Sequence, residues 1–498
     1  MKYLRDNRNF EFVIFFIISL LISFFFYKIF LPAEDATILY RYSENLAETG
    51  VISYNFNGSP TEGATDFLWM ILLSIFYFIG FDTYLASILI NLISLYFIIK
   101  LIENFYSLKK IDFFILIFFH LSLTQTYSAI LGFSVLFVEL ILVLVVINYL
   151  KGNIFKTLLF SFIGCLVRPD FILFIIIPNL FNLIQNFNLK NLKLYLIFFI
   201  LGLIYFFLRY SYFDLIFPLP FYVKNQWNIL NNLEWGRQII ILLPGIIILF
   251  FIEIKKILNR RIIVLIFTIV LATFYYSNQI LYQNIGYRFY FYFPILTILI
   301  LYEIQRECLK NNQLVRNIII LISISSLLIN FSQKFNSVNF LTKEESIYNI
   351  SNELKKVNEN ISLSLATTEA GLLPYYSKIN TVDLFGLNTK KFASKPADGG
   401  LFIEREFDLI VINSSITGEN CNSLKNLLDE VKDKKLNSSK RSDDWSTFSK
   451  NLISGIDMNK YEAYFLVYPK NIFLNRNSEA YKEISEIIRN NMIEKCDY

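Results

Sequence analysis

Long apolar segments recur along the first two thirds of the chain. Between residues 10 and 331 they come in blocks close to the roughly 20 residues that a helix needs to cross a bilayer. Two apolar halves between 155 and 189 flank Arg168, Pro169 and Asp170, and a proline with two charges predicts a broken helix or a re-entrant hairpin there. Ordinary spans are expected at 10–30, 83–101, 112–129, 133–150, 194–210, 238–254, 262–281, 289–305 and 317–333.

The first apolar block follows a basic amino terminus, so a cleaved signal peptide has to be weighed against a permanent anchor. The block is longer than an ordinary signal core, and no small-residue cleavage site precedes the polar stretch that begins at Pro32. We therefore expect an anchor. Residues 67–81 are also apolar, but at 1.5 Å per residue they reach only about 22 Å, which favours an interfacial helix. The pattern predicts a polytopic α-helical membrane protein of about 11 membrane segments with a large outer loop at 31–82.

Basic residues predict the orientation, because lysine and arginine favour cytoplasmic loops. With the amino terminus inside, connections that hold Lys109, Lys110, Lys255, Arg260 and Arg261 face the cytosol. The outer connections are poorer in basic residues. This register places the first loop and everything beyond the last span on the outer face, and we expect a bacterial inner membrane protein.

The composition becomes polar and mixed in charge after about residue 333, which divides the chain into a membrane module, 1–333, and a soluble domain, 334–498. Strand-like runs at 362–367, 381–385, 407–413 and 463–468 alternate with helix-like segments at 342–357, 422–434 and 478–494. This alternation predicts a C-terminal extracytoplasmic α/β domain. Cys421 and Cys496 both fall in it, and the sequence leaves open whether they form a disulfide.

Composition and motifs exclude several classes of protein. Of the 498 residues 55% are hydrophobic and only 17% charged, against roughly 25% in soluble domains. No Walker loop or GxGxxG element follows a strand, so neither ATP-driven transport nor a Rossmann nucleotide site is indicated. The net charge of +5 comes mostly from loop lysines and arginines and does not favour nucleic acid. The one histidine, His120, lies in an apolar span, so we expect no metal-ligand role for it.

Polar residues close to the membrane carry the candidate chemistry. Glu34 and Asp35 stand immediately beyond the first apolar block. Such a pair could bind a divalent cation, take a proton from an incoming hydroxyl, or lie in a solvated turn. The residues that follow have the spacing of an amphipathic surface helix, with Arg41 and Glu44 on its polar flanks.

The first loop resembles that of a known enzyme family. EDATILYRYSENLAETGVISYNFNG at 34–58, followed by TEGATDFLW at 61–69, is similar to the first outer loop of GT-C glycosyltransferases, particularly the terminal arabinofuranosyltransferase branch. Further similar stretches are VRPDF at 167–171, RYSYFDLIFPLPFYVK at 209–224, IGYRFYFYFP at 285–294 and AGLLPYYSKINTVDLFGLN at 370–388. The resemblance therefore extends over most of the chain in short motifs.

The resemblance implies a GT-C-like fold and a transferase that moves a sugar from a polyprenyl-phosphate donor to a glycan, lipid or protein hydroxyl at the outer face. It implies that Asp35 is the catalytic base, with Glu34 as the second candidate. Arg288, Lys224 and Arg168 would bind the donor phosphate, as cations suit a phosphate leaving group. Residues expected to contact substrate are Arg41, Glu62, Asp66, Trp69, Asp214, Tyr222 and Asp383.

Structural roles stay open beside these assignments. Arg288 and Lys224 could snorkel to lipid headgroups, and Arg168 could pair with Asp170. Tyrosine and tryptophan also favour membrane interfaces for reasons unrelated to sugars. The alternative class is a polytopic transporter or a flippase of lipid-linked sugars, which would predict repeated broken helices in two halves. A catalytically inactive scaffold is the third possibility.

Overall fold

The computed structural model describes residues 2–223, 235–250, 259–279, 281, 284–308, 312–413, 445–466, 470–491 and 494–496. Their contacts divide the chain into two compact units. Unit 1 comprises Met1–Pro32, Asp66–Ser211 and Trp227–Val338, and unit 2 comprises Ala33–Thr65, Tyr212–Gln226 and Asn339–Tyr498. Unit 2 therefore joins two loops of the predicted membrane module to the predicted soluble domain.

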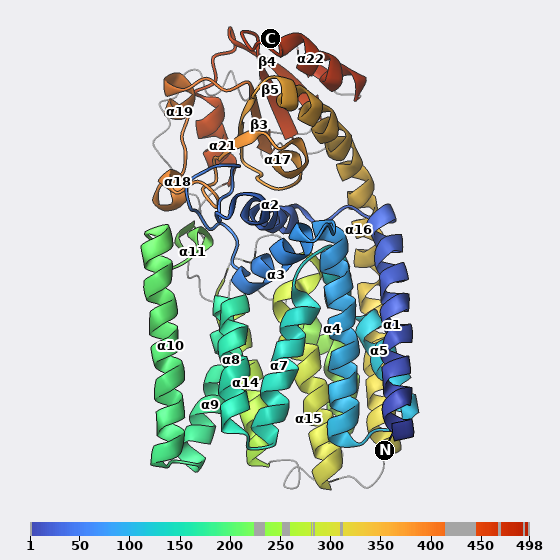
Figure 1. Ribbon diagram of the computed structural model, residues 1–498. Coiled ribbons are helices and arrows are strands. Elements are labelled where there is room, and N and C mark those ends of the chain that lie inside the picture. The colour runs from blue at the N-terminus through green and yellow to red at the C-terminus, as the bar shows by residue number, and fades with distance from the viewer. Residues whose placement is uncertain are drawn as a thin grey trace. The chain divides into compact units, whose positions relative to one another are not determined.

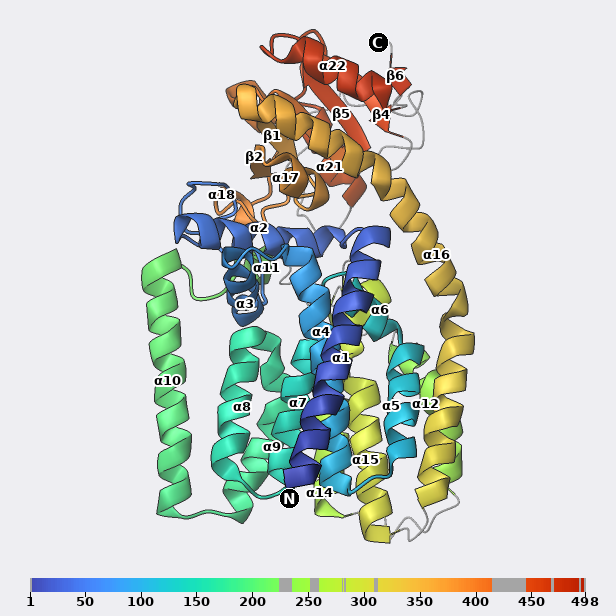
Figure 2. The same ribbon diagram turned by 45° about the vertical axis from the view of Figure 1, so that its right-hand side comes forward.

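Unit 1 is helical, and its apolar elements α4, α7 and α15 run side by side (Figures 1 and 2). Its elements are α1 (Lys2–Ile29), α3 (Phe67–Phe78), α4 (Thr83–Tyr106), α5 (Lys110–Ser122), α6 (Thr124–Ile130), α7 (Val135–Leu150), α8 (Ile154–Val167), η1 (Pro169–Phe171), α9 (Ile172–Gln185), α10 (Leu189–Phe213), α12 (Trp235–Phe250), α14 (Arg260–Ser277), η2 (Ile285–Tyr290), α15 (Tyr292–Cys308) and the first part of α16 (Asn312–Asn360).

Six helices of the described residues are long and apolar enough to cross a membrane, or seven spans result if the bent pair α5 and α6 counts as one. The six coincide with the predicted spans at 10–30, 83–101, 194–210, 262–281, 289–305 and 317–333. Phe67–Phe78, Val135–Leu150, Ile154–Val167 and Pro169–Gln185 are shorter apolar helices. The class of helical membrane protein is thus confirmed, whereas the predicted total of about 11 segments goes beyond what these helices show.

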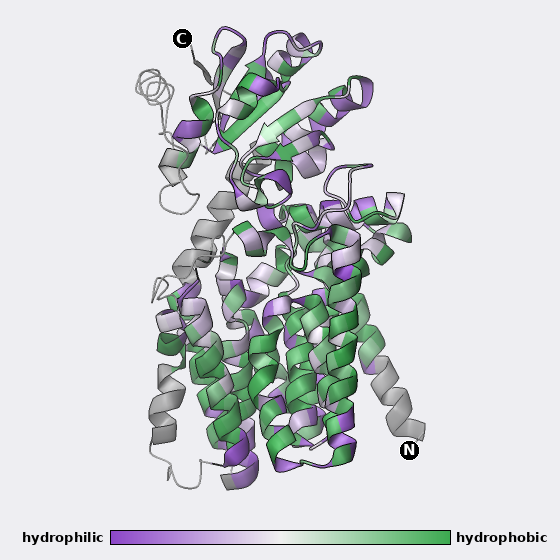
Figure 3. Cartoon of the chain, turned by 90° about the vertical axis from the view of Figure 1, so that its left-hand side faces the viewer, coloured by the Kyte–Doolittle hydropathy of each residue, from purple (hydrophilic) through white to green (hydrophobic). Residues whose placement is uncertain are grey.

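Large apolar side chains face outward on several of these helices, which fits a lipid environment rather than water. On α10, Phe207 and Leu208 are among many exposed apolar residues. Figure 3 shows the same helices coloured predominantly as hydrophobic, while unit 2 mixes hydrophobic and hydrophilic positions.

The prediction of one continuous span at 112–129 was wrong, because α5 and α6 meet at Leu123 with a bend of 77°. Buried side chains satisfy the backbone around this break, as an apolar environment requires. Oγ1 of Thr126 on α6 donates to the carbonyl oxygen of His120, and Oγ of Ser326 on α16 donates to that of Ser122. Polar groups freed by the interruption are therefore paired inside the bundle.

Among its described residues, unit 2 contains a six-stranded mixed sheet of order β2-β1-β3-β5-β4-β6, which confirms the predicted α/β domain. Strands β1, β2 and β3 are parallel, and β3, β5, β4 and β6 pair antiparallel. Its elements are α2 (Glu34–Thr49), α11 (Leu219–Val223), the end of α16, β1 (Ser364–Thr367), α17 (Leu372–Ser377), β2 (Asn380–Asp383), α18 (Lys391–Ser394), α19 (Gly400–Glu404), β3 (Leu409–Asn413), α21 (Trp445–Ile453), β4 (Tyr461–Leu466), β5 (Lys470–Asn475), α22 (Tyr481–Asn490) and β6 (Glu494–Cys496).

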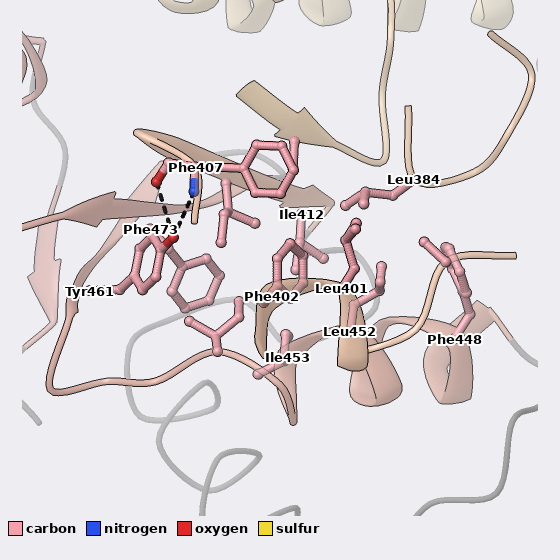
Figure 4. Close-up of a cluster of buried hydrophobic side chains, with 14 of the residues drawn as sticks. Leu384, Leu401, Phe402, Phe407, Ile412, Phe448, Leu452, Ile453, Tyr461 and Phe473 are labelled. Atoms are coloured by element: carbon pink, nitrogen blue, oxygen red, sulfur yellow. Dashed lines mark hydrogen bonds between the residues drawn. The ribbon is translucent and has the colours of Figure 1, made fainter. Parts of the chain in front are cut away.

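Both faces of this sheet are covered, as the unbroken apolar run of β3 requires. Ile410 and Ile412 face α19 and α21 in one core, shown in Figure 4, where the hydroxyl of Tyr461 also donates to the carbonyl oxygen of Phe407. Leu409 and Val411 face the opposite core, which α17, α22 and the end of α16 complete. Strands β5 and β6 were not predicted, and both the helix predicted at 422–434 and Cys421 lie outside the described residues.

Candidate functional site

The predicted site residues fall into both units, and each group is described within its own unit. Unit 1 contains Asp66, Trp69, Arg168 and Arg288. Lys224 lies outside the described residues. The residues in unit 2 are Glu34, Asp35, Arg41, Glu62, Asp214, Tyr222 and Asp383.

Arg168 occupies the break between α8 and η1, where the following proline favours an extended backbone. Its Nε donates to Oδ1 of Asp170 at 3.0 Å and its Nη2 to Oδ2 at 2.8 Å, a two-pronged ion pair. The hydroxyl of Tyr276 on α14 donates to the same Oδ2 at 2.7 Å. Asp170 thus fixes the orientation of Arg168, while Nη1 has no acceptor among the residues that the structure describes.

Arg288 follows a tight turn at the start of η2. Gly286 and Tyr287 have φ of 61° and 55°, in the left-handed region that glycine tolerates and that costs most other residues energy. A side chain at 286 would also collide, because an added Cβ would lie 2.3 Å from Oγ of Ser128. The backbone is therefore held in one unusual conformation directly before the arginine.

The two arginines contact the same aromatic ring. The guanidinium carbon of Arg168 lies 5.1 Å from the ring centre of Phe289, and that of Arg288 lies 5.0 Å from it. Arg288 also sits 3.8 Å over the ring of Phe133. Aromatic faces stabilise cations without neutralising them. Two residues predicted to bind phosphate, 120 positions apart in the sequence, therefore belong to one cluster in unit 1.

Asp66 belongs to the same cluster. Trp69, three residues later in the sequence, makes an apolar contact instead. The hydroxyl of Ser134 donates to Oδ2 of Asp66, and Asp66 is close enough to Arg168 to interact with its charge. Trp69 is 1% exposed, and its ring centre lies 5.4 Å from that of Phe137. This packing describes a core residue, and its predicted contact with sugar remains a prediction.

Residues that the sequence interpretation passed over complete this arginine cluster. Phe289 and Tyr287 lie in the IGYRFYFYFP stretch already singled out, so their neighbourhood was visible in the sequence. Arg237 was not among the predicted site residues, yet its Nη1 donates to the hydroxyl of Tyr287 at 2.8 Å. Its Nη2 donates to the carbonyl oxygen of Ile329. Arg237 therefore braces the turn that presents Arg288, a contact that no local pattern indicates.

In unit 2, Glu34 and Asp35 form the first turn of α2, where the helix dipole favours negative charge. The two carboxylates have different surroundings. Glu34 is 7% exposed and its Oε1 accepts the backbone N–H of Gly371 at 2.8 Å. Asp35 is half-buried. Of the two candidate bases, Asp35 is the more accessible to a substrate.

The prediction that Arg41 lies on the polar flank of a surface helix was wrong. Arg41 is 3% exposed, and it donates to the carbonyl oxygens of Tyr54, Pro374 and Ile379 and to Oδ1 of Asn55. Burial lowers the pKa of its guanidinium from the usual value. These bonds to protein backbone describe a structural role, and contact with substrate remains a prediction.

Glu44 departs from the prediction in the same way. Its Oε1 accepts the hydroxyl of Tyr375 at 2.6 Å, and its Oε2 pairs with Nζ of Lys378 at 2.5 Å. The polar side of α2 is thus covered within unit 2, because residues around α17 supply partners for Arg41 and Glu44, which the amphipathic pattern assigned to solvent.

The remaining predicted residues of unit 2 lie in several environments. Asp383 ends β2, and burial raises the pKa of its carboxyl although four N–H groups, from Phe385, Gly386 and Asn388, donate to it. Glu62 is buried, and its carbonyl oxygen accepts the N–H of Leu219.

Asp214 and Tyr222 are the exposed members of the set. The Asp214 side chain is 83% exposed and pairs with Lys390 at 3.2 Å. The hydroxyl of Tyr222 accepts the N–H of Phe217 at 3.4 Å. No group of three or more His, Cys, Asp or Glu that could hold a metal ion occurs among the described residues.

Comparison with known proteins gives two kinds of match. Residues 343–468 match the model of a domain of unknown function, DUF8728. No curated protein matches the sequence. The crystal structure of ArnT from Cupriavidus metallidurans in the apo state is similar with a TM-score of 0.56 and 11% identity, over 94% of this chain and 98% of that one. The structure of the same protein bound to undecaprenyl phosphate is similar with a TM-score of 0.54 and 11% identity, over 81% and 93%.

These findings define a class, a helical membrane protein that carries a mixed α/β domain. The likeness spans nearly the whole chain, so the membrane helices and the sheet recur together. The particular fold is similar to that of ArnT, and a GT-C-like fold is what the sequence resemblance implied. Membership of the terminal arabinofuranosyltransferase branch remains a prediction.

Proposed function

We propose that this chain is an integral membrane glycosyltransferase that transfers a sugar from a polyprenyl-phosphate donor to a hydroxyl acceptor at the outer face of the membrane. The observation that carries the proposal is the likeness, over nearly the whole chain, to ArnT, whose structure was also solved with undecaprenyl phosphate bound. A lipid-phosphate ligand suits the arginine cluster of unit 1. The loop motifs quoted above support the same class independently of the fold.

Arg168 and Arg288 are proposed to bind the donor phosphate. Both are more than nine-tenths buried and both contact Phe289, so a bound phosphate would meet their charge in a setting where water screens it weakly. The ion pair with Asp170 uses one N–H on Nε and one on Nη2 of Arg168, and the two N–H groups of Nη1 are proposed to bind a phosphate oxygen. Positive charge there would stabilise the phosphate as it leaves the sugar.

Asp35 is proposed as the catalytic base. The acceptor O–H gives its proton to the carboxylate, the acceptor oxygen forms a bond to the anomeric carbon, and the bond between that carbon and the phosphate oxygen breaks. The electron pair leaves with the phosphate, so charge and atoms balance without a further reagent. Asp35 suits this role better than Glu34 because Asp35 is half-buried, whereas Glu34 is 7% exposed and its carboxylate accepts the N–H of Gly371.

The test supplies purified protein with a panel of polyprenyl-phosphate sugars and hydroxyl acceptors and measures the glycosidic product. The wild type is expected to turn over at least one donor and the Asp35→Asn variant to lose product formation while remaining folded. Movement of the lipid-linked sugar across vesicles without any glycosidic product would instead support the transporter or flippase class.

A further inference from the structure

We infer that the C-terminal domain is a positioning element of the catalytic loop, and that Glu34 is the positioning residue through which it fixes Asp35. The inference rests on the proposed role of Asp35 and concerns contacts within unit 2 alone. It assigns a task to a domain whose matched model carries no function.

The first contact joins the start of α2 to the segment after β1. Oε1 of Glu34 accepts the N–H of Gly371 at 2.8 Å. The two backbones approach so closely that a Cβ at residue 371 would lie 2.3 Å from the carbonyl oxygen of Glu34 and 2.6 Å from its carboxyl carbon. Only glycine fits there without moving α2. The neighbouring Asp35 is carried on the same turn of helix, so its direction follows from this contact.

The same segment, residues 370–381, binds α2 again two turns further on. Nη1 of Arg41 donates to the carbonyl oxygen of Pro374 at 2.5 Å and Nη2 to that of Ile379 at 2.7 Å. Positions 34 and 41 share one face of a helix, since seven residues make about two turns. Contacts at both places fix the rotation of α2 about its own axis as well as its position.

The loop that follows α2 is attached to this segment too. The hydroxyl of Tyr54 donates to the carbonyl oxygen of Ala370 at 2.6 Å. Asn55 donates to the carbonyl oxygen of Thr381 and accepts its N–H, both at 2.9 Å. All these groups are buried or half-buried, so the attachment is an internal interface and water is largely excluded from it.

The segment that contacts α2 lies at a particular place in the sheet topology. Residues 368–379 connect the parallel strands β1 and β2 and begin at the carboxyl end of β1. In α/β sheets this edge is where ligands bind, most often where neighbouring strands are connected in opposite directions. Such a reversal occurs at β1, because β2 and β3 pair on its two sides. In this chain the group bound at that edge is the carboxylate of Glu34, from the loop that carries Asp35, rather than a separate ligand.

The decisive variant is Glu34→Gln, because a glutamine Oε1 can still accept the N–H of Gly371 but cannot act as a base. We expect turnover within about fivefold of wild type for Glu34→Gln. Glu34→Ala and Gly371→Ala should lower kcat about 10- to 100-fold, as small misplacements of catalytic groups do. KM for the donor should stay unchanged, since the arginines of unit 1 are untouched. Gly202→Ala is the matched control, because its added Cβ meets nothing within 4 Å.

Loss of activity by Glu34→Gln as complete as that of Asp35→Asn would overturn the inference and make Glu34 the base. A second measurement does not depend on turnover: amide hydrogen exchange in α2 should accelerate in Gly371→Ala and stay unchanged in Gly202→Ala. If the wild type turns over no donor in the panel, accelerated exchange would still support the positioning contact while the proposed reaction fails. Unchanged exchange in Gly371→Ala would overturn the contact itself.

Discussion

Charged side chains are buried in different ways in the two units. In unit 1, Arg168 and Arg288 lie where helices are interrupted, and their partners are a carboxylate two residues away and aromatic rings. In unit 2, Glu34 and Arg41 lie inside a regular helix, and their partners include backbone groups more than 330 residues away. In unit 1 the buried arginines thus contact aromatic rings and a nearby carboxylate, while in unit 2 the buried charged side chains hydrogen-bond to segments that are distant in the sequence.

The largest expected effect separates chemistry from binding. Asp35→Asn should lower kcat about 100- to 10,000-fold, the range associated with a general base, because the amide cannot accept the acceptor proton. Binding of undecaprenyl phosphate, measured with the same purified variant, should not change, because the proposed phosphate ligands are in unit 1. Equal losses of turnover and of lipid-phosphate binding would contradict this division of roles.

The next effect should appear in binding. Arg288→Gln is expected to weaken binding of undecaprenyl phosphate about 10- to 100-fold, since a hydrogen bond to a charged group contributes roughly 1.5–3 kcal/mol. Arg260→Gln, at the exposed start of α14, serves as the control for the loss of one positive charge. The affinity should also fall with added salt for the wild type and less steeply for Arg288→Gln. An unchanged affinity would return Arg288 to a purely structural role.

The turn before Arg288 gives a third test. Gly286→Ala should destabilise unit 1 more than Gly152→Ala, although both glycines have left-handed φ, 61° and 70°. The backbone strain is similar, but only at 286 would the added Cβ collide, with Ser128 and Thr124. The collision should cost about 1–3 kcal/mol beyond the shared strain, measured by thermal unfolding in detergent. A weaker loss of lipid-phosphate binding than in Arg288→Gln should accompany it. Equal unfolding midpoints for the two variants would contradict the packing argument.

The contrast between the units also decides what the sequence could reveal. Two features of unit 1 could be anticipated from neighbouring residues in the sequence. Pro169 and Asp170 directly follow Arg168 and indicate the break and the ion pair, and Gly286 indicates a turn just before Arg288. The covered side of α2 could not be anticipated, because the helical period shows which residues share a face but not what covers that face. The amphipathic pattern therefore assigned Arg41 and Glu44 to solvent, when Pro374, Tyr375 and Lys378 supply their partners.

Strands and bends show the same limit. The strands β1 to β4 were anticipated because their apolar runs are bounded by polar residues, whereas β5 and β6 depend on pairing with β4 for their identity. The 77° bend between α5 and α6 has no proline or glycine at Leu123 to announce it. The carbonyl oxygens beside this bend are paired by Thr126, just beyond it, and by Ser326, which lies on another helix.

The smallest effect is expected at the exposed edge of unit 2. Asp214 has a φ of 53°, which asparagine tolerates as well as aspartate, so Asp214→Asn removes charge without adding backbone strain. Its side chain is 83% exposed and its ion pair with Lys390 is open to solvent, where such pairs contribute about 0–1 kcal/mol. Turnover and the unfolding midpoint should therefore change little, and kcat/KM for the acceptor should fall by less than about fivefold. Lys390→Gln should give the same result, because it removes the other partner of the same pair. A much larger fall for Asp214→Asn alone would place this carboxylate on the acceptor, as the family resemblance implies, and would mean that unit 2 also reserves charge for a substrate.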